Sequence, residues 1–286
     1  MERPRELIIT ADDFGADLAV NEAVEIGHRE GVLTAASLMV GAPGAADAIR
    51  RARAMPSLRV GLHIVLVDGR PVLPASRVSH LVDAEGAFRV DMARAGATMF
   101  FHPAARRQLA AEIAAQFDAF AHTGLVLDHV NAHKHFHLHP TIAGLILKIG
   151  ARHGLKAARA PIEPAAVLQA LEPGVYRGGG VVDLWGGLTR QCFRRAGLTV
   201  PDQVFGLRWS GAMTPPRVRG LIERLPAGLT ELYLHPALHG DFAGAAPGYH
   251  YAEELAALTD QGVAQAASRA DIRLGGFVDF ARGRGP

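Results

Sequence analysis

The sequence predicts a parallel β/α barrel of the TIM-like type, distorted or seven-stranded, rather than a regular eightfold ring. Short apolar segments of strand type alternate with helical segments along the whole chain. Short connections between parallel strands require right-handed crossovers, which favour one parallel sheet. In addition, Asp or His residues stand where several of these strands end, and barrels build their sites at that end. A doubly wound open sheet is the second choice.

The elements follow from apolar spacing and from the residues that begin and end helices. Asp17 is a suitable N-cap for the first helix, and Gly31 is a suitable residue after its end. Pro103 and Pro140 each open a later helix. The expected strands cover residues 7–10, 35–40, 58–66, 125–127, 155–159, 203–207, 230–235 and 274–280. The expected helices cover 18–30 and 45–55, segments from 103 and from 140, one ending near 196, and 216–225 and 251–269.

We expect one domain over residues 1–286, with a long loop insertion around 67–102. That segment shows no sustained period and contains Pro71, Pro74 and Gly86. A connection of this length is usually a lid, a binding loop or disordered. A second loop, Gly178–Gly180, lacks the Gly-Lys-Ser/Thr of a phosphate-binding loop.

Composition excludes several classes of protein. The 286 residues are 49% hydrophobic and 20% charged, with a formal net charge of +2. No basic block implies nucleic acid, and no apolar run reaches the roughly 18 residues that span a bilayer. The single Cys192 excludes a disulfide framework and a cysteine zinc site. The first residues do not read as a secretory signal, so we expect a cytoplasmic protein.

Histidines are concentrated in one short stretch. Five of the 14 lie between His129 and His139. They follow the apolar run 125–127, and residues two apart share a face of a strand, so His129, Asn131 and His133 should point to one side. Such a cluster indicates metal binding, proton transfer or both. The histidine-rich stretch could alternatively be an expression tag, but tags lie at termini and lack apolar flanking residues.

Other chemistry-bearing residues stand at separate strand ends. Asp12 and Asp13 are adjacent carboxylates directly after the strand 7–10, which predicts two different roles because neighbours in an extended chain point apart. The alternative role for these two aspartates is that of a helix N-cap, but Asp17 is better placed to cap the following helix. A lone His in an apolar strand, such as His63, is more often a satisfied core residue, but its place beside another such strand end favours function. His235 repeats the pattern of an apolar strand that ends in His.

These residue types suit metal-assisted hydrolysis of an amide or ester. One Asp and two His around a divalent ion leave positions open for water and substrate. A second carboxylate can take a proton from water, and a protonated His can give one to a leaving amine. The sequence offers no nucleophilic Ser or Cys arrangement.

The combination resembles the YdjC-like carbohydrate deacetylases over nearly the whole chain. The matching segments, in order, are Thr10-Ala11-Asp12-Asp13-Phe14-Gly15, Val60-Gly61-Leu62-His63, the run Asn131 to Pro140, Arg159 to Glu163, and Leu234-His235-Pro236. The resemblance implies a barrel related to polysaccharide deacetylases and metal-dependent removal of acetate from an N-acetylated sugar. It further implies that Asp13, His63 and His133 bind the metal, that Asp12 is the general base, and that His235 is the general acid.

One departure bears on the substrate. Relatives that act on chitooligosaccharides often have Asp where Asn131 stands, which favours similarity to the hopanoid-biosynthesis-associated branch, HpnK. That branch removes acetate from an N-acetylglucosaminyl group on a hopanoid side chain. Asn131, Arg159, His135 and His137 are expected to contact substrate, although Arg159 could instead pair with a site carboxylate or be solvated.

The ion is expected to be Zn²⁺ or Mg²⁺, with Mn²⁺ or Co²⁺ as alternatives. An N-acetylated sugar or glycolipid is the expected partner, and nucleic acid is not. Peripheral contact with lipid of the inner membrane and a homodimer are left open. The rival functions are a chitooligosaccharide deacetylase, another metal hydrolase such as a phosphoesterase, and a catalytically silent metal- or sugar-binding protein. The pairing of Asp12 with Asp13 argues against the last, since binding alone needs only one.

Overall fold

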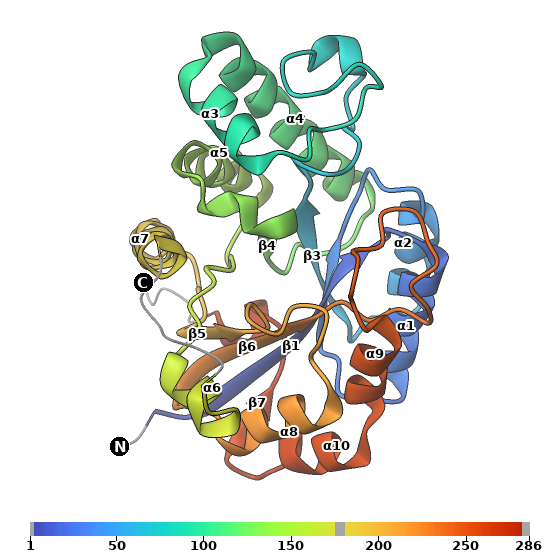
Figure 1. Cartoon of the computed structure of the whole chain (residues 1–286), viewed down its shortest axis with the longest axis vertical. Coiled ribbons are helices and arrows are strands. Elements are labelled where there is room, and N and C mark those ends of the chain that lie inside the picture. Colours follow the sequence, from blue (N-terminus) through green and yellow to red (C-terminus); the bar gives the residue numbers. More distant parts are fainter. Residues whose placement is uncertain (1–2, 175–180, 282–286) are drawn as a thin grey trace.

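The computed structural model describes residues 3–174 and 181–281, so the Gly178–Gly180 loop lies outside the described part. Strands form a curled sheet with helices around its outside (Figure 1). The strands are β1 (Arg5–Phe14), β2 (Ala35–Leu38), β3 (Arg59–Ile64), β4 (Val130–Ala132), β5 (Gln203–Phe205), β6 (Gly228–Leu234) and β7 (Ile272–Leu274). The helices are α1 (Leu18–Arg29), α2 (Ala45–Arg53), α3 (Met92–Phe101), α4 (Pro103–His122), α5 (Pro140–Gly150), α6 (Ala165–Leu171), α7 (Val181–Arg195), α8 (Pro215–Glu223), α9 (Tyr251–Thr259) and α10 (Gln261–Ala267). Short 3₁₀ turns are η1 (Ala75–Arg77), η2 (His133–Leu138), η3 (Ala151–His153) and η4 (Val278–Phe280).

The sheet is parallel, with the order β4-β3-β2-β1-β6-β5, and β7 pairs with the start of β1. The segment from 157 to 162 lies between the two ends of this order. On one side, Arg159 N–H donates to the Val130 carbonyl over 3.1 Å, and on the other, Val204 N–H donates to the Ile162 carbonyl over 2.8 Å. The prediction of a distorted, nearly closed parallel barrel is therefore confirmed.

The two faces of β1 show how the barrel is filled. Leu7, Ile9 and Ala11 belong to the main apolar core, with residues of the surrounding helices. Ile8 points to the other face and belongs to a small separate cluster with Ala35, Ala157, Leu229, Phe277 and Phe280. Because side chains alternate along a strand, Thr10 and Asp12 follow Ile8 on this inner face. The interior is thus apolar at the amino end of the strands and polar toward their carboxyl end.

Several boundaries differ from the expected ones. The strand expected at 125–127 lies at Val130–Ala132 instead, because pairing with β3 begins only where Asp128 N–H donates to the Val60 carbonyl, and Val126 is exposed. The strand expected at 274–280 is β7 followed by the turn η4. The helix expected over 251–269 is divided at Asp260, whose side chain caps α10 by accepting from Val263 N–H.

The insertion at 67–102 is not all loop. Its end forms α3, which packs against α4, and Asp91 caps that helix by accepting from Arg94 N–H. No helix in the described part of the chain combines the length and apolar character needed to cross a membrane.

Candidate metal centre

Asp13, His63 and His133 converge at the carboxyl ends of β1, β3 and β4. One ligand atom from each lies within 4.8 Å of the other two. His63 Nε2 is 3.2 Å from Asp13 Oδ1, and His133 Nδ1 is 3.0 Å from the same oxygen. Two imidazoles and a carboxylate around one point form a donor set that suits a divalent transition metal and leaves coordination positions open.

A β-bulge allows the two neighbouring aspartates to reach different partners. The register between β1 and β2 shifts between Ala11 and Phe14, and Asp13 has a φ of 60°. A bulge turns one residue out of the alternation of the strand and redirects its side chain. Asp12 consequently points into the barrel while Asp13 reaches both histidines. The prediction of separate roles thus has a backbone cause.

The hydrogen bonds of His63 leave one nitrogen facing a carboxylate. Its Nδ1 lies 2.6 Å from Asn131 Oδ1, which can only accept, so Nδ1 carries the hydrogen. The lone pair of Nε2 then faces Asp13 Oδ1, and Nε2 is buried without a hydrogen-bond partner. Two acceptors facing each other repel unless a cation lies between them. Burial would lower the pKa of His63, but the Asp12 and Asp13 carboxylates outweigh burial and raise that pKa, so the same surroundings attract a proton when no metal is bound. The residues present therefore fit a metal ion, which these three side chains would hold.

Electrostatics at this point favour the charged carboxylate. Burial alone would raise the pKa of Asp13, but the His133 and His63 rings, when protonated, outweigh it and hold that pKa well below its usual range. The surroundings of Asp13 thus favour the ionised carboxylate. An ionised carboxylate is the form that binds a metal.

Asp12 lies beside the candidate metal ligands Asp13, His63 and His133, in a buried ion-pair network. Arg159 donates from Nη1 to Asp12 Oδ2 over 2.5 Å and from Nη2 to Asp12 Oδ1 over 3.0 Å, and it also donates to Glu231. Asn131 Nδ2 donates to Asp12 Oδ1 over 3.1 Å. Burial would raise the pKa of Asp12, but the Arg159 charge outweighs burial and lowers it well below the usual value.

These contacts show what Arg159 and Asn131 bind within the protein. Both side chains are fully buried, and their hydrogen bonds go to protein groups. Their contact with substrate stays a prediction. Of the interpretations open from the sequence, pairing of Arg159 with a site carboxylate is the one observed, and Asn131 supports both His63 and Asp12.

His235 follows β6 on the same inner face as Glu231 and Tyr233. Its side chain is 12% exposed, and its Nδ1 is 3.9 Å from the buried Glu254 carboxylate. Burial raises the pKa of Glu254. The His235 ring packs against the rings of Tyr233 and Tyr249 at centroid distances of 5.6 and 5.1 Å. The position permits proton donation toward a group bound over the metal.

His135 and His137 lie in η2 and are neutral in the folded protein. Burial lowers the pKa of His137 to about 3 and that of His135 well below its usual value. His135 Nε2 is 2.9 Å from the Tyr233 hydroxyl, while its Nδ1 has no hydrogen-bond partner. Lys134 and His135 have φ values of 52° and 54°, so this turn holds two residues in the sparsely populated left-handed region. Contact of these histidines with substrate stays a prediction.

A pocket of about 490 Å³ opens beside the metal group, and Asp13 and His133 form part of its wall. Much of the wall is apolar, with Met39, Val65, Val72, Phe88, Val90 and Phe242. The pocket therefore joins the polar metal group to an apolar surface made by the 67–102 insertion and the loop after β6.

Sequence reasoning missed Ser37, Glu231, Tyr233 and Glu254. Glu231 and Tyr233 carried a usable signal, since they alternate with His235 on one face of the strand 230–235. Ser37 and Glu254 carried none, because a serine in a short strand and a glutamate in a helix are ordinary. Their burial became visible only in the structure.

Comparison with known proteins agrees with this geometry. A family model described as YdjC-like protein matches residues 6–269. A relative from Geobacillus stearothermophilus named carbohydrate deacetylase is 30% identical over 97% of this chain and 98% of its own. A Brevibacillus brevis protein of the same name is 38% identical, but the alignment covers only 52% of this chain and 56% of that one. A crystal structure of an Enterococcus faecalis protein superposes with a TM-score of 0.76 and 23% identity, over 98% of this chain and all of that one, and shows the fold alone.

Proposed function

The chain belongs to the YdjC-like family, and we propose that it is a metal-dependent N-deacetylase that hydrolyses the acetamide of an N-acetylglucosaminyl group. The observation that carries the proposal is a spare ionised carboxylate beside a three-residue metal group. Asp12 belongs to no metal ligand set in the described residues, and yet it lies next to Asp13 with its charge maintained by Arg159. Binding of a metal alone would not require it.

Each residue then has a chemical task. Asp13, His63 and His133 would hold the ion, which would polarise the acetamide carbonyl and lower the pKa of a bound water. Asp12 accepts the proton of the attacking water. Arg159 keeps Asp12 ionised and oriented, at the cost of basicity. The mixed Asp and His donors suit Zn²⁺ and also accommodate Mg²⁺, Mn²⁺ or Co²⁺.

His235 is the proposed acid that protonates the leaving amine. It stands at the partly exposed rim of the site, with the Glu254 carboxylate 3.9 Å from its Nδ1. Proton donation by His235 lets the sugar leave as a neutral amine rather than as an amide anion.

For the substrate, we propose an N-acetylglucosaminyl group attached to a hopanoid, as in the HpnK branch. The support is the apolar wall of the pocket that begins at Asp13 and His133. Two of the polar side chains on that wall are bonded within the protein: Gln116 exchanges two hydrogen bonds with the Val65 backbone, and Asp83 accepts from two backbone N–H groups. Asp68 and Arg70 are exposed. The apolar part of the wall suits an apolar substituent, which needs no hydrogen-bond partner.

Exposed apolar residues on the segment from 90 to 101 support the same proposal. Val90 lines the pocket and is 69% exposed. Phe100 and Phe101 lie at the far end of α3 and are 47% and 78% exposed. Apolar side chains on this segment would meet the lipid that carries the sugar, in line with peripheral contact at a membrane.

Acetate release from three compounds tests the substrate. Metal-loaded protein receives an N-acetylglucosaminyl hopanoid in detergent, diacetylchitobiose, and a generic phosphoester. We expect the glycolipid to have the highest kcat/KM, slower release from diacetylchitobiose, and no phosphate release. Preference for diacetylchitobiose would instead support the chitooligosaccharide alternative, and tight binding of sugar without any acetate would support the silent binding protein.

Substitution of Asp12 tests the base. Asp12→Asn should lower acetate release by about 10²–10⁴-fold, the usual contribution of general base catalysis, while metal content stays near one ion per chain. Asp17→Asn is the matched control, because Asn caps a helix as well as Asp and residue 17 caps α1. An Asp12→Asn variant with wild-type turnover would remove Asp12 from the mechanism.

A further inference from the structure

Four buried polar side chains form a continuous hydrogen-bonded chain through the barrel interior. Asp128 Oδ2 is 2.9 Å from His129 Nδ1, and His129 Nε2 is 3.0 Å from Ser37 Oγ. Asn131 Nδ2 donates to Ser37 Oγ over 2.9 Å, and its Oδ1 accepts from His63. We propose that this hydrogen-bonded chain, anchored at Asp128 and at Asp12, fixes the amide of Asn131 in one orientation and thereby selects the tautomer in which His63 offers Nε2 to the metal. The inference uses the metal group of the proposed function but not its substrate.

The direction of every hydrogen bond follows from the two carboxylates at the ends. At the end near Asp12, Arg159 holds Asp12 as a carboxylate, which can only accept hydrogen bonds. The NH₂ group of Asn131 must therefore face Asp12. That NH₂ group also donates to Ser37, and the single hydroxyl hydrogen of Ser37 is left for His129 Nε2.

At the other end, the carboxylate of Asp128 can likewise only accept hydrogen bonds. His129 therefore carries its hydrogen on Nδ1, donates it to Asp128, and presents the bare Nε2 that Ser37 requires. The two ends thus demand the same arrangement. The reverse arrangement would turn the Asn131 oxygen toward Asp12, only 3.1 Å away, and place two acceptors against each other.

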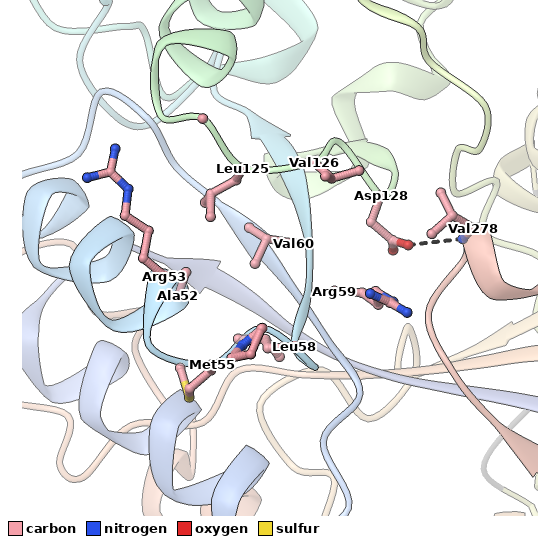
Figure 2. Close-up of a pocket in the computed structure, with 12 residues that line it drawn as sticks. Ala52, Arg53, Met55, Leu58, Arg59, Val60, Leu125, Val126, Asp128 and Val278 are labelled. Atoms are coloured by element: carbon pink, nitrogen blue, oxygen red, sulfur yellow. Dashed lines mark hydrogen bonds between the residues drawn. The ribbon is translucent and has the colours of Figure 1, made fainter.

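Asp128 is itself held by the far end of the barrel. It accepts from Phe277 N–H over 3.1 Å and from Val278 N–H over 2.9 Å, so its orientation depends on the backbone at the start of η4. Figure 2 shows Asp128 and its bond to Val278 in the wall of a pocket of about 290 Å³ beside the start of β3. The Phe277 ring stacks on His129 with centroids 4.1 Å apart.

Space for the His129 ring is provided by a glycine. A Cβ on Gly61 would lie 2.5 Å from two atoms of that ring, so only glycine at this position of β3 lets the imidazole lie flat across the strand. The ring is thus confined between β3 and Phe277. A confined imidazole cannot turn to exchange its two nitrogens.

The arrangement of Ser37, His129 and Asp128 has the spacing of a nucleophilic triad but not its accessibility. The serine and histidine are fully buried. Ser37 Oγ also accepts a hydrogen bond from Asn131, and no surface of it is open to a substrate. The three residues are positioning residues for the metal group rather than a second catalytic site.

Ser37→Ala interrupts this hydrogen-bonded chain of side chains and tests the inference. In metal-free protein labelled with ¹⁵N-histidine, at a pH at which the His63 ring is neutral, NMR should report its hydrogen on Nδ1 in the wild type. Ser37→Ala leaves Asp12 as the remaining anchor of the Asn131 amide, so the variant should show a larger fraction of His63 with its hydrogen on Nε2. Zn²⁺ affinity, measured by competition with a chelator, should fall by about 10–100-fold, the usual effect of losing the partner that orients a ligand. Acetate release at saturating Zn²⁺ should fall much less.

The matched control is Ser57→Ala, which removes another serine–histidine hydrogen bond, 2.8 Å to His28, far from the metal group. It should leave both the tautomer of His63 and the Zn²⁺ affinity unchanged. Asp128→Asn serves as a second variant, since its amide can donate to His129 and should move the hydrogen of that ring to Nε2. If Ser37→Ala keeps the wild-type tautomer and affinity, or if Ser57→Ala weakens Zn²⁺ equally, the inference is overturned, whatever the substrate proves to be.

Discussion

Arg159 stabilises the site because it is shared by two buried carboxylates. It pairs with Asp12 and Glu231, and its guanidinium lies 4.5 Å from the centre of the Tyr233 ring. Removal of one partner from a buried ion-pair network leaves an uncompensated charge. This residue therefore connects stability to catalysis more directly than the metal ligands do.

Arg159→Met should lower the free energy of unfolding by about 3–5 kcal/mol, because Asp12 and Glu231 would remain buried without a cation. Urea denaturation of metal-free protein measures it. Arg269→Ala, which breaks the exposed pair with Asp271, is the control and should cost about 0–1 kcal/mol. Equal effects of the two substitutions would contradict the buried network, and the double variant Arg159→Met with Glu231→Gln should recover part of the loss.

The sequence identifies functional residues more readily than it identifies the side chains that those residues contact. Asp12, Asp13, His63 and His133 were recognisable because polar residues at the ends of apolar strands are unusual, and the family pattern assigns them. The role of Asn131 was not recognisable, because it depends on three hydrogen bonds to residues far apart in the chain. A single amide in a strand reveals nothing of such partners.

Among the elements, β3 matters most for the site, because it carries both His63 and the glycine against which His129 lies. The apolar pattern 58–66 predicted this strand well. The pattern at 125–127 was misleading, because pairing with β3 begins only at Asp128 and Val126 is exposed. A short apolar run does not by itself fix the start of a strand, which depends on the neighbouring strand.

Gly61→Ala should destabilise the protein by about 1–3 kcal/mol, the usual result of overpacking, and weaken metal binding, because its Cβ would displace the His129 ring. Gly144→Ala is the matched control. Gly144 lies inside α5 with open space around its Cα, so alanine there should stabilise the helix by about 0.5–1 kcal/mol. Thermal unfolding and Zn²⁺ titration of both variants check the prediction, which fails if Gly61→Ala behaves like Gly144→Ala.

Over the whole molecule, the barrel gathers its polar groups at one end and in one interior column. The alternation of strands and helices predicted the parallel architecture. It could not predict that residues 157–162 would complete the ring almost without regular pairing, since this depends on the final geometry of the other strands. The helix α3 was missed because Gly96 and the short apolar stretch gave no clear period.

Buried neutral histidines make the stability of the molecule depend on pH. The pKa of His137 is about 3 in the folded chain because burial disfavours its charged form, whereas an unfolded chain protonates near 6.5. The unfolded state therefore binds more protons between these values, and the free energy of unfolding should fall as pH decreases from 6.5 toward 3. In metal-free protein, His137→Gln should reduce this slope by up to about 1.4 kcal/mol per pH unit. An unchanged slope would show that His137 is protonated in the folded state.

The metal centre requires that Asp13, His63 and His133 share one ion. X-ray absorption spectroscopy of protein loaded with one equivalent of Zn²⁺, together with the His63→Ala and His133→Ala variants, measures whether they do. We expect two imidazole nitrogens at about 2.0–2.1 Å and oxygen ligands in the remaining positions. Each variant should lose one imidazole and most of the affinity. A spectrum without imidazole scattering, or variants that still bind one Zn²⁺ as tightly as the wild type, would show that these side chains do not share an ion.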